Sequence, residues 1–91
     1  MLRIEKKQRM NGHTVVALSG DIHQNDVAQL RTIVRTALRT SDEVRIDCEE
    51  VRLLDREVVR FLASCRLEGV RLIHAPAYVR EWLRSERRNG K

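Results

Sequence analysis

The sequence contains very few aromatic side chains. Phe61, Tyr78 and Trp82 make up 3% of the 91 residues. An apolar core must therefore be built from aliphatic residues, and the aromatic platforms on which proteins stack single-stranded nucleic acid are nearly absent. The chain also has no linker-like, repeated or low-complexity tract, in keeping with its single proline and four glycines.

Cysteine is scarce as well. Cys48 and Cys65 are separated by sixteen residues and form no CxxC pair or Cys/His cluster, so neither a redox motif nor a zinc site is predicted. We expect both to be reduced and buried. Cys65 is a weak candidate for a nucleophile, because no base lies near it in the sequence. Since His13, His23 and His74 lack the spacing of metal ligands, we predict no metal and no other cofactor.

Long hydrophobic runs are missing too. No apolar stretch approaches the ~18 residues that cross a bilayer. The amino terminus is charged from Arg3 onward, which excludes a secretory signal, and no lipidation pattern is present. These absences predict a cytoplasmic protein.

What the chain does have is charge and aliphatic side chains, with 34% charged and 42% hydrophobic residues. Its 18 basic residues exceed its 13 acidic residues by five, and all but three of the basic residues are arginines. Arginine prefers carboxylate and phosphate partners, so the excess is either an anion-binding face or an ordinary solvated surface. We favour the solvated surface.

The apolar pattern alternates between the periods of strands and helices. Strands are predicted around residues 2–5, 14–18, 44–48 and 70–74, and a tight turn at Asn11-Gly12 joins the first two. The second strand is expected to end at residues 19–21. In the third, Glu49-Glu50 form a charged connection before extended or irregular structure resumes at 51–54.

Three helices are predicted between and after these strands. The first starts at Asn25 as its N-cap and ends before residues 40–42, the second covers 56–67 with Asp55 as N-cap, and the third starts at Pro76. The order β-β-α-β-α-β-α predicts an α/β fold in which helices pack against a mixed sheet. We expect one domain over residues 1–88, with a frayed tail at 89–91.

Two stretches resemble the STAS domain family. Residues 18–23, Leu-Ser-Gly-Asp-Ile-His, resemble the family's L-x-G-x-L-D pattern, and residues 44–55 resemble its hydrophobic-D-L-x-x-V-x-x-h-D pattern. The resemblance continues through Gly69, the 70–73 strand and the helix around 79–83. It implies a four-stranded mixed sheet packed by three helices. It also implies a non-enzymatic interaction module of bacterial signal transduction, such as an anti-sigma-factor antagonist that regulates transcription.

The sequence departs from the signalling members of that family after Asp55. Those members carry two hydroxyl residues and a glycine there, and a partner kinase phosphorylates a hydroxyl, whereas this chain has Arg56-Glu57-Val58. Glu57 occupies the position that is most often phosphorylated. It is either a fixed negative charge that imitates phosphate, a glutamate that only favours the helix dipole, or part of a scaffold that is no longer switched.

The resemblance places partner binding on the loop after Gly20 and the start of the second helix. The candidate residues are Asp21, His23, Asn25, Asp55, Arg56, Glu57 and Arg60. Implied partners are an anti-sigma kinase-like protein, a sensory complex or a transporter ATPase, with a homodimer left open. We interpret His23 as an exposed loop residue, although proximity to Asp55 or Glu57 would make it pH-sensitive.

A rival function is nucleic-acid binding through Arg31, Arg35 and Arg39, which follow one another at intervals of four on the first helix. This rival lacks phosphate-binding loops, aromatic platforms and a helix-turn-helix pattern. An enzyme is the weakest alternative, because no nucleophile, base or metal constellation has a recognisable spacing.

Overall fold

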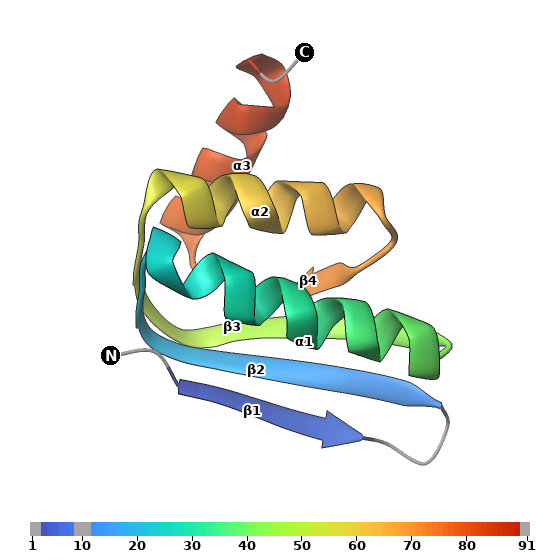
Figure 1. Ribbon diagram of the computed structural model, residues 1–91. Helices are drawn as coiled ribbons and strands as arrows, with labels where there is room; N and C mark the ends of the chain where they lie inside the picture. Colours follow the sequence, from blue (N-terminus) through green and yellow to red (C-terminus); the bar gives the residue numbers. More distant parts are fainter. Residues whose placement is uncertain (1–2, 9–11, 90–91) are drawn as a thin grey trace.

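Four strands form one mixed sheet with the order β1-β2-β3-β4 (Figure 1). The structure is a computed structural model that describes residues 3–8 and 12–89. The strands are β1 (Arg3–Gln8), β2 (His13–Ile22), β3 (Glu43–Leu54) and β4 (Arg71–Ile73). β1 pairs with β2 antiparallel, while β2, β3 and β4 are parallel to one another. The predicted mixed sheet is confirmed.

The helices all lie on one side of this sheet (Figure 1). They are the 3-10 turn η1 (Gln24–Asp26), α1 (Val27–Thr40), α2 (Arg56–Leu67) and α3 (Ala77–Asn89). The α/β class and the predicted element order are therefore confirmed. No helix in the described residues is long and apolar enough to cross a membrane.

The core between the sheet and the helices is mainly aliphatic, with Phe61 as its one buried aromatic side chain among the described residues. Val16 and Leu18 of β2 and Ile46 of β3 alternate with outward-facing residues and are at most 1% exposed. The broad apolar face of α2 is buried, because α2 packs against β4, α1 and α3. Complete burial of each such side chain contributes about 1.5–3 kcal/mol of transfer free energy.

The central strands are longer than the sequence predicted. β2 does not end at residues 19–21, and Glu49-Glu50 do not interrupt β3, so both predictions are wrong. The pairing of β2 with β3 shifts register between Ala17 and Ser19 and then continues. Gly20, with a φ of 88°, accommodates the second shift. As a result Ile22 and Leu54 end up as neighbours at the ends of their strands.

The first helix also begins differently from the prediction. Asn25 is not its N-cap; it lies exposed within η1, and α1 starts at Val27 after Asp26. Asp26 decides this geometry, because its carboxylate Oδ2 accepts a hydrogen bond from the backbone N–H of His23 at 2.9 Å. The backbone N–H of Asp26 donates in turn to the carbonyl of His23 at 2.8 Å, so His23 is the N-cap of η1 and the helical turn begins at Gln24, before Asn25.

The later elements follow the sequence more closely. Asp55 caps α2, and Gly69 follows its C-terminus with a φ of 94°. β4 is shorter than predicted. α3 begins after Pro76, whose carbonyl accepts hydrogen bonds from Val79 and Arg80, both at 3.0 Å.

Three predictions fall at least partly outside the described residues. They are the start of the first strand at Leu2, the hairpin turn at Asn11 and the part of the frayed tail at residues 90–91. The domain limits 1–88 stay a prediction.

Candidate functional site

The candidate site lies where the parallel strands β2 and β3 end side by side. The carboxyl ends of neighbouring parallel strands are a common location for binding sites in α/β sheets. Ile22 and Leu54 are paired there, and the backbone N–H of Asp55 donates to the carbonyl of Ile22 at 3.3 Å. The 3-10 turn η1 and the first turn of α2 therefore start next to each other.

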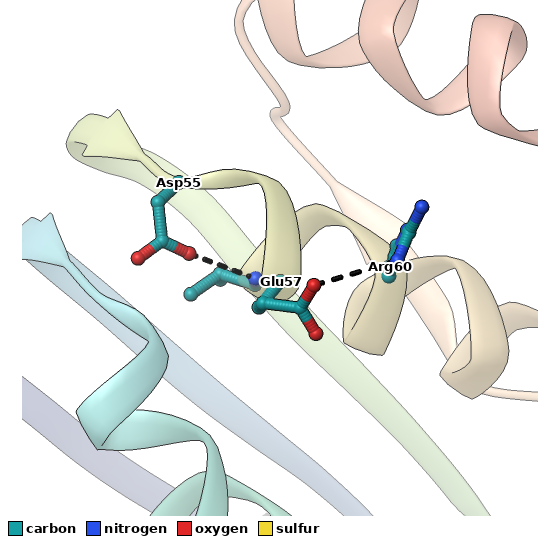
Figure 2. Close-up of polar contacts among 4 residues, drawn as sticks. Asp55, Glu57 and Arg60 are labelled. Carbon is teal, nitrogen blue, oxygen red and sulfur yellow. Dashed lines mark hydrogen bonds and ion pairs between the residues drawn. The ribbon is translucent and has the colours of Figure 1, made fainter.

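The carboxylate of Asp55 holds these two segments together. Oδ1 accepts a hydrogen bond from the backbone N–H of Val58 at 3.1 Å, which caps α2 (Figure 2). Oδ2 accepts one from the backbone N–H of Gln24, in η1, at 2.6 Å. The negative charge also lies at the positive end of the α2 dipole. One side chain thus fixes both the start of α2 and its position beside η1.

Exposed charges of both signs surround this cap. Arg56, Glu57 and Arg60 are all exposed on the first turns of α2. Oε1 of Glu57 lies 3.4 Å from Nη1 of Arg60 (Figure 2). An exposed pair of this kind contributes only about 0.2–1 kcal/mol to stability. Both groups are therefore accessible to a binding partner.

A shallow depression of about 310 Å³ joins η1 to α2. Gln24, Asn25, Val27 and Glu57 line it. Its lining mixes one aliphatic side chain with two amides and a carboxylate. Such a composition suits contact with the surface of another protein rather than enclosure of a small substrate.

A profile of the family described as "Mlab, STAS domain" matches residues 6–87. The chain belongs to the STAS family. Among solved structures, the anti-sigma factor antagonist SpoIIAA in its unphosphorylated form superposes with a TM-score of 0.71 and 16% identity, covering 87% of this chain and 79% of that one. An uncharacterized protein from Shewanella loihica with a SpoIIAA-like fold superposes with a TM-score of 0.59 and 17% identity. The match covers 98% of this chain and 76% of that one.

At these identities the two structures show a shared fold, which confirms the mixed four-stranded sheet with three helices. No curated protein matches the chain. The resemblance stated from the sequence is confirmed by the family match. The STAS domain is thereby established, while the residues predicted to bind a partner stay a prediction.

Six of the seven residues predicted for partner binding gather on η1 and α2 of the STAS domain. His23 and Asn25 are exposed in or beside η1, and Asp55 lies between them and the exposed charges of α2. His23 is therefore a loop residue on the surface, as interpreted from the sequence.

Asp21 has a different environment from the other six residues. It is half-buried in β2, with Oδ1 3.9 Å from Nε of Arg52 in β3. Oδ1 is also inaccessible to solvent and has no hydrogen-bond partner within the described residues. The Tyr78 hydroxyl donates to the carbonyl of Arg52 at 2.7 Å, and burial, with the nearby Cys48 and Asp21, raises the pKa of Tyr78. Asp21 thus faces β3 and the start of α3.

Sequence reasoning missed two contributors to the site. Gln24 takes part through its backbone N–H, which no side-chain pattern reveals. Val27 follows the apolar period of α1 and packs against the core, yet it also lines the depression. Recognising either requires knowing that β2 and β3 end together.

The two cysteines of the STAS domain are inert. Cys48 and Cys65 are 0% and 2% exposed. Burial raises the pKa of each thiol to about 12, so both are protonated near neutral pH. Because the thiolate is the nucleophile, this burial disfavours Cys65 as a nucleophile in the folded domain.

One group of potential metal ligands forms in space although the sequence predicted none. Asp47, Glu49 and His74 bring carboxylate and imidazole atoms within 4.8 Å of one another. Oδ1 of Asp47 contacts Nδ1 of His74 at 3.2 Å and accepts from the backbone N–H of Glu49 at 3.0 Å. These three residues could ligate a divalent cation, and their contacts with one another also account for the cluster without one.

The arginines of α1 lie on its exposed face, as predicted. Arg31, Arg35 and Arg39 are exposed. The guanidinium carbon of Arg31 lies 5.7 Å from the centroid of the Phe61 ring, a cation–π contact with α2. One member of the predicted stripe is therefore engaged in packing within the domain, which weakens the case for nucleic-acid binding.

Proposed function

We propose that this STAS domain is a non-enzymatic regulatory module of the cytoplasm that docks a partner protein with η1 and the first turns of α2. We name six residues the docking surface: His23, Asn25, Asp55, Arg56, Glu57 and Arg60. The observation that carries the proposal is the double hydrogen bond of Asp55, to Gln24 and to Val58. It fixes two exposed segments in one arrangement.

Such an arrangement favours binding because ordering flexible groups during association costs free energy. A capped helix start and a closed 3-10 turn are already ordered before the partner arrives. Arg56, Glu57 and Arg60 then offer charges of both signs, which give specificity and register more than raw affinity. Asp21 is half-buried in β2 beside Arg52 and is not part of this surface.

The partner class that we propose is an anti-sigma-factor-type protein. The similarity of the fold to that of SpoIIAA, whose structure is described as an anti-sigma factor antagonist, supports this choice. A sensory complex, a transporter ATPase and a second copy of the chain are the other outcomes that a binding experiment would distinguish.

We further propose that docking is independent of phosphorylation at the start of α2. Arg56, Glu57 and Val58 carry no hydroxyl group that a kinase could modify. The carboxylate of Glu57 is a permanent part of the side chain and is not added or removed by an enzyme, and Arg60 lies beside it. A carboxylate carries less charge and fewer acceptor oxygens than phosphate, so Glu57 favours one binding state without switching between two.

The test uses the full chain, tagged, as bait in a lysate of its source organism, with quantitative mass spectrometry of what is retained. Wild type is compared with Arg56→Ala/Glu57→Ala. The matched control is Glu68→Ala/Arg71→Ala, which also removes one exposed acid and one exposed base, but at the other end of α2 and on β4.

Any protein enriched by wild type is then purified and titrated against all three chains. We expect the docking-surface variant to weaken binding at least ~10-fold and the control to change it less than ~2-fold. Equal binding by wild type and the docking-surface variant would show that the partner uses another face. The identity of the partner decides between the partner classes.

A further inference from the structure

A second concave surface lies away from the docking surface, between the C-terminal end of α2, β4 and α3. It encloses about 450 Å³. Leu72, Ala75 and Leu83 contribute aliphatic lining, and Leu83 is only 2% exposed. Arg66, Arg80 and Arg84 are exposed and contribute three guanidinium groups. We call this hollow the arginine pocket.

The arginine pocket concentrates positive charge that the protein does not fully neutralise. Arg80 and Arg84 are one turn apart on α3, where like charges repel, and Arg66 adds a third charge from α2. Nη1 of Arg84 pairs with Oε2 of Glu81 at 3.1 Å. In the part of the chain that the structure describes, Arg66 and Arg80 have no ion-pair partner. An anion between them would relieve this repulsion.

His74 also lines the arginine pocket, and its backbone is unusual. Its φ of 58° is left-handed, a conformation that non-glycine residues rarely adopt and that is often found at functional sites. Nδ1 of His74 contacts Oδ1 of Asp47 at 3.2 Å. Asp47 and Glu49 therefore lie beside His74, and Glu81 lies beside Arg84, while Arg66 and Arg80 have no such acidic neighbour within ion-pair distance among the described residues.

Together these features define the chemistry of a ligand. Guanidinium groups bind phosphate and carboxylate through paired N–H donors, and three of them favour a dianion over a monoanion. The aliphatic lining favours an apolar body attached to that anion. The volume falls within the range of about 300–1,000 Å³ typical of small-molecule sites. We propose that the arginine pocket binds an organic phosphate monoester with an aliphatic body.

Hexyl phosphate is the probe, because it has both parts. The full chain, labelled with nitrogen-15, is titrated with hexyl phosphate, inorganic phosphate and hexanol while the backbone amide signals are followed. We expect saturable shifts at Leu72, Ala75 and Leu83 with hexyl phosphate, and at least ~10-fold weaker binding of either fragment alone. The absence of saturable shifts at these residues would overturn the proposal, as would equal affinity for inorganic phosphate.

A pair of double variants separates a specific site from general attraction to a basic protein. Arg66→Gln/Arg80→Gln removes two charges from the arginine pocket, and Arg35→Gln/Arg39→Gln removes two exposed charges from α1. We expect the first to weaken hexyl phosphate binding at least ~10-fold and the second less than ~2-fold. Equal weakening by both would overturn the proposal. Because all four arginines are exposed, we expect both variants to fold. The amide spectrum of each variant verifies this.

The same monoester chemistry occurs in soluble metabolites and in the headgroup of phosphatidic acid. Sedimentation with phosphatidylcholine vesicles, with and without phosphatidic acid, distinguishes these sources. Binding that needs phosphatidic acid and is lost in Arg66→Gln/Arg80→Gln assigns a lipid, while hexyl phosphate binding without vesicle binding assigns a soluble ester. The docking surface takes no part in the hexyl phosphate titration or in the vesicle sedimentation. The outcome of the partner-binding test is therefore independent of these results.

Discussion

The backbone N–H of Gln24 donates to Oδ2 of Asp55 across 2.6 Å, and this bond joins the loop after β2 to the start of α2. The residues are far apart in sequence and meet because β2 and β3 end together. The other carboxylate oxygen caps α2 through Val58. A serine in place of Asp55 would retain a capping oxygen but have no second acceptor for Gln24.

The two functions of Asp55 are therefore separable by mutation. Asp55→Ala loses both the cap and the bond to Gln24, and we expect it to lower the free energy of unfolding by about 2–3 kcal/mol. Asp55→Ser keeps the cap and should lose about 1 kcal/mol less. Urea unfolding measures both values.

Amide hydrogen exchange supplies the local readout for the same variants. The Gln24 amide should exchange faster in both variants, whereas the Val58 amide should exchange faster only in Asp55→Ala. Continued protection of Gln24 in Asp55→Ser would contradict the bridging role that we assign to the carboxylate.

The buried thiols give a prediction about reactivity. Burial raises the pKa of Cys48 and of Cys65 to about 12 in the folded domain, so both carry far less thiolate at pH 8 than exposed cysteines. We expect Ellman's reagent at pH 8 to modify neither thiol until the domain unfolds. Since folding keeps the thiols protonated, reactivity should rise with pH and with urea. Rapid modification of one cysteine in the folded state would place that thiol in solvent.

The contact between Arg31 and Phe61 links α1 to α2. An exposed cation–π contact contributes about 0.5–1 kcal/mol, so Arg31→Ala should destabilise the domain by roughly that amount. Arg35→Ala is the matched control, because Arg35 is exposed one turn later on the same helix. Thermal unfolding of both variants measures the difference. Identical melting temperatures would mean that the Arg31 contact adds nothing to stability.

Much of the fold could be predicted because its signals are local. The alternation of Val44, Ile46 and Cys48 indicates a strand without knowledge of its neighbours, and Asp55 ahead of an apolar helical period indicates a cap. The register shift beside Ser19 could not be predicted in this way, because it depends on how two distant strands pair. Missing that shift also hid the continuity of β3 through Glu49 and Glu50.

In the candidate site, too, local features could be predicted from the sequence and contacts between distant segments could not. Glu57 and Arg60 could be placed together from their spacing on one helix, and the structure pairs them. Asn25 and Asp26 are both good capping residues by type, but the carboxylate of Asp26 accepts from the backbone N–H of His23 and makes no capping bond to α1, which only the folded turn reveals. The arginine pocket draws on α2 and α3, so the sequence presents its arginines as unrelated surface charges.

The end of α2 offers a test of backbone conformation alone. Gly69 donates to the carbonyl of Arg66 at 3.1 Å and Val70 to that of Cys65 at 3.0 Å, the two bonds of a Schellman motif. With a φ of 94°, position 69 disfavours any side chain, yet a Cβ there would meet no atom within 4 Å. We therefore expect Gly69→Ala to cost about 1 kcal/mol of unfolding free energy through strain, with no steric clash.

Asparagine tolerates left-handed backbone better than alanine, so Gly69→Asn should cost about half as much. Glu68→Ala is the neighbouring control, because Glu68 has an ordinary φ of −92° and an exposed side chain. Urea unfolding should show a lower midpoint with an unchanged m-value for Gly69→Ala and almost no change for Glu68→Ala. If both glycine variants matched wild type, α2 would not depend on the left-handed residue that ends it, and the turn into β4 would be set by the burial of Val70 instead.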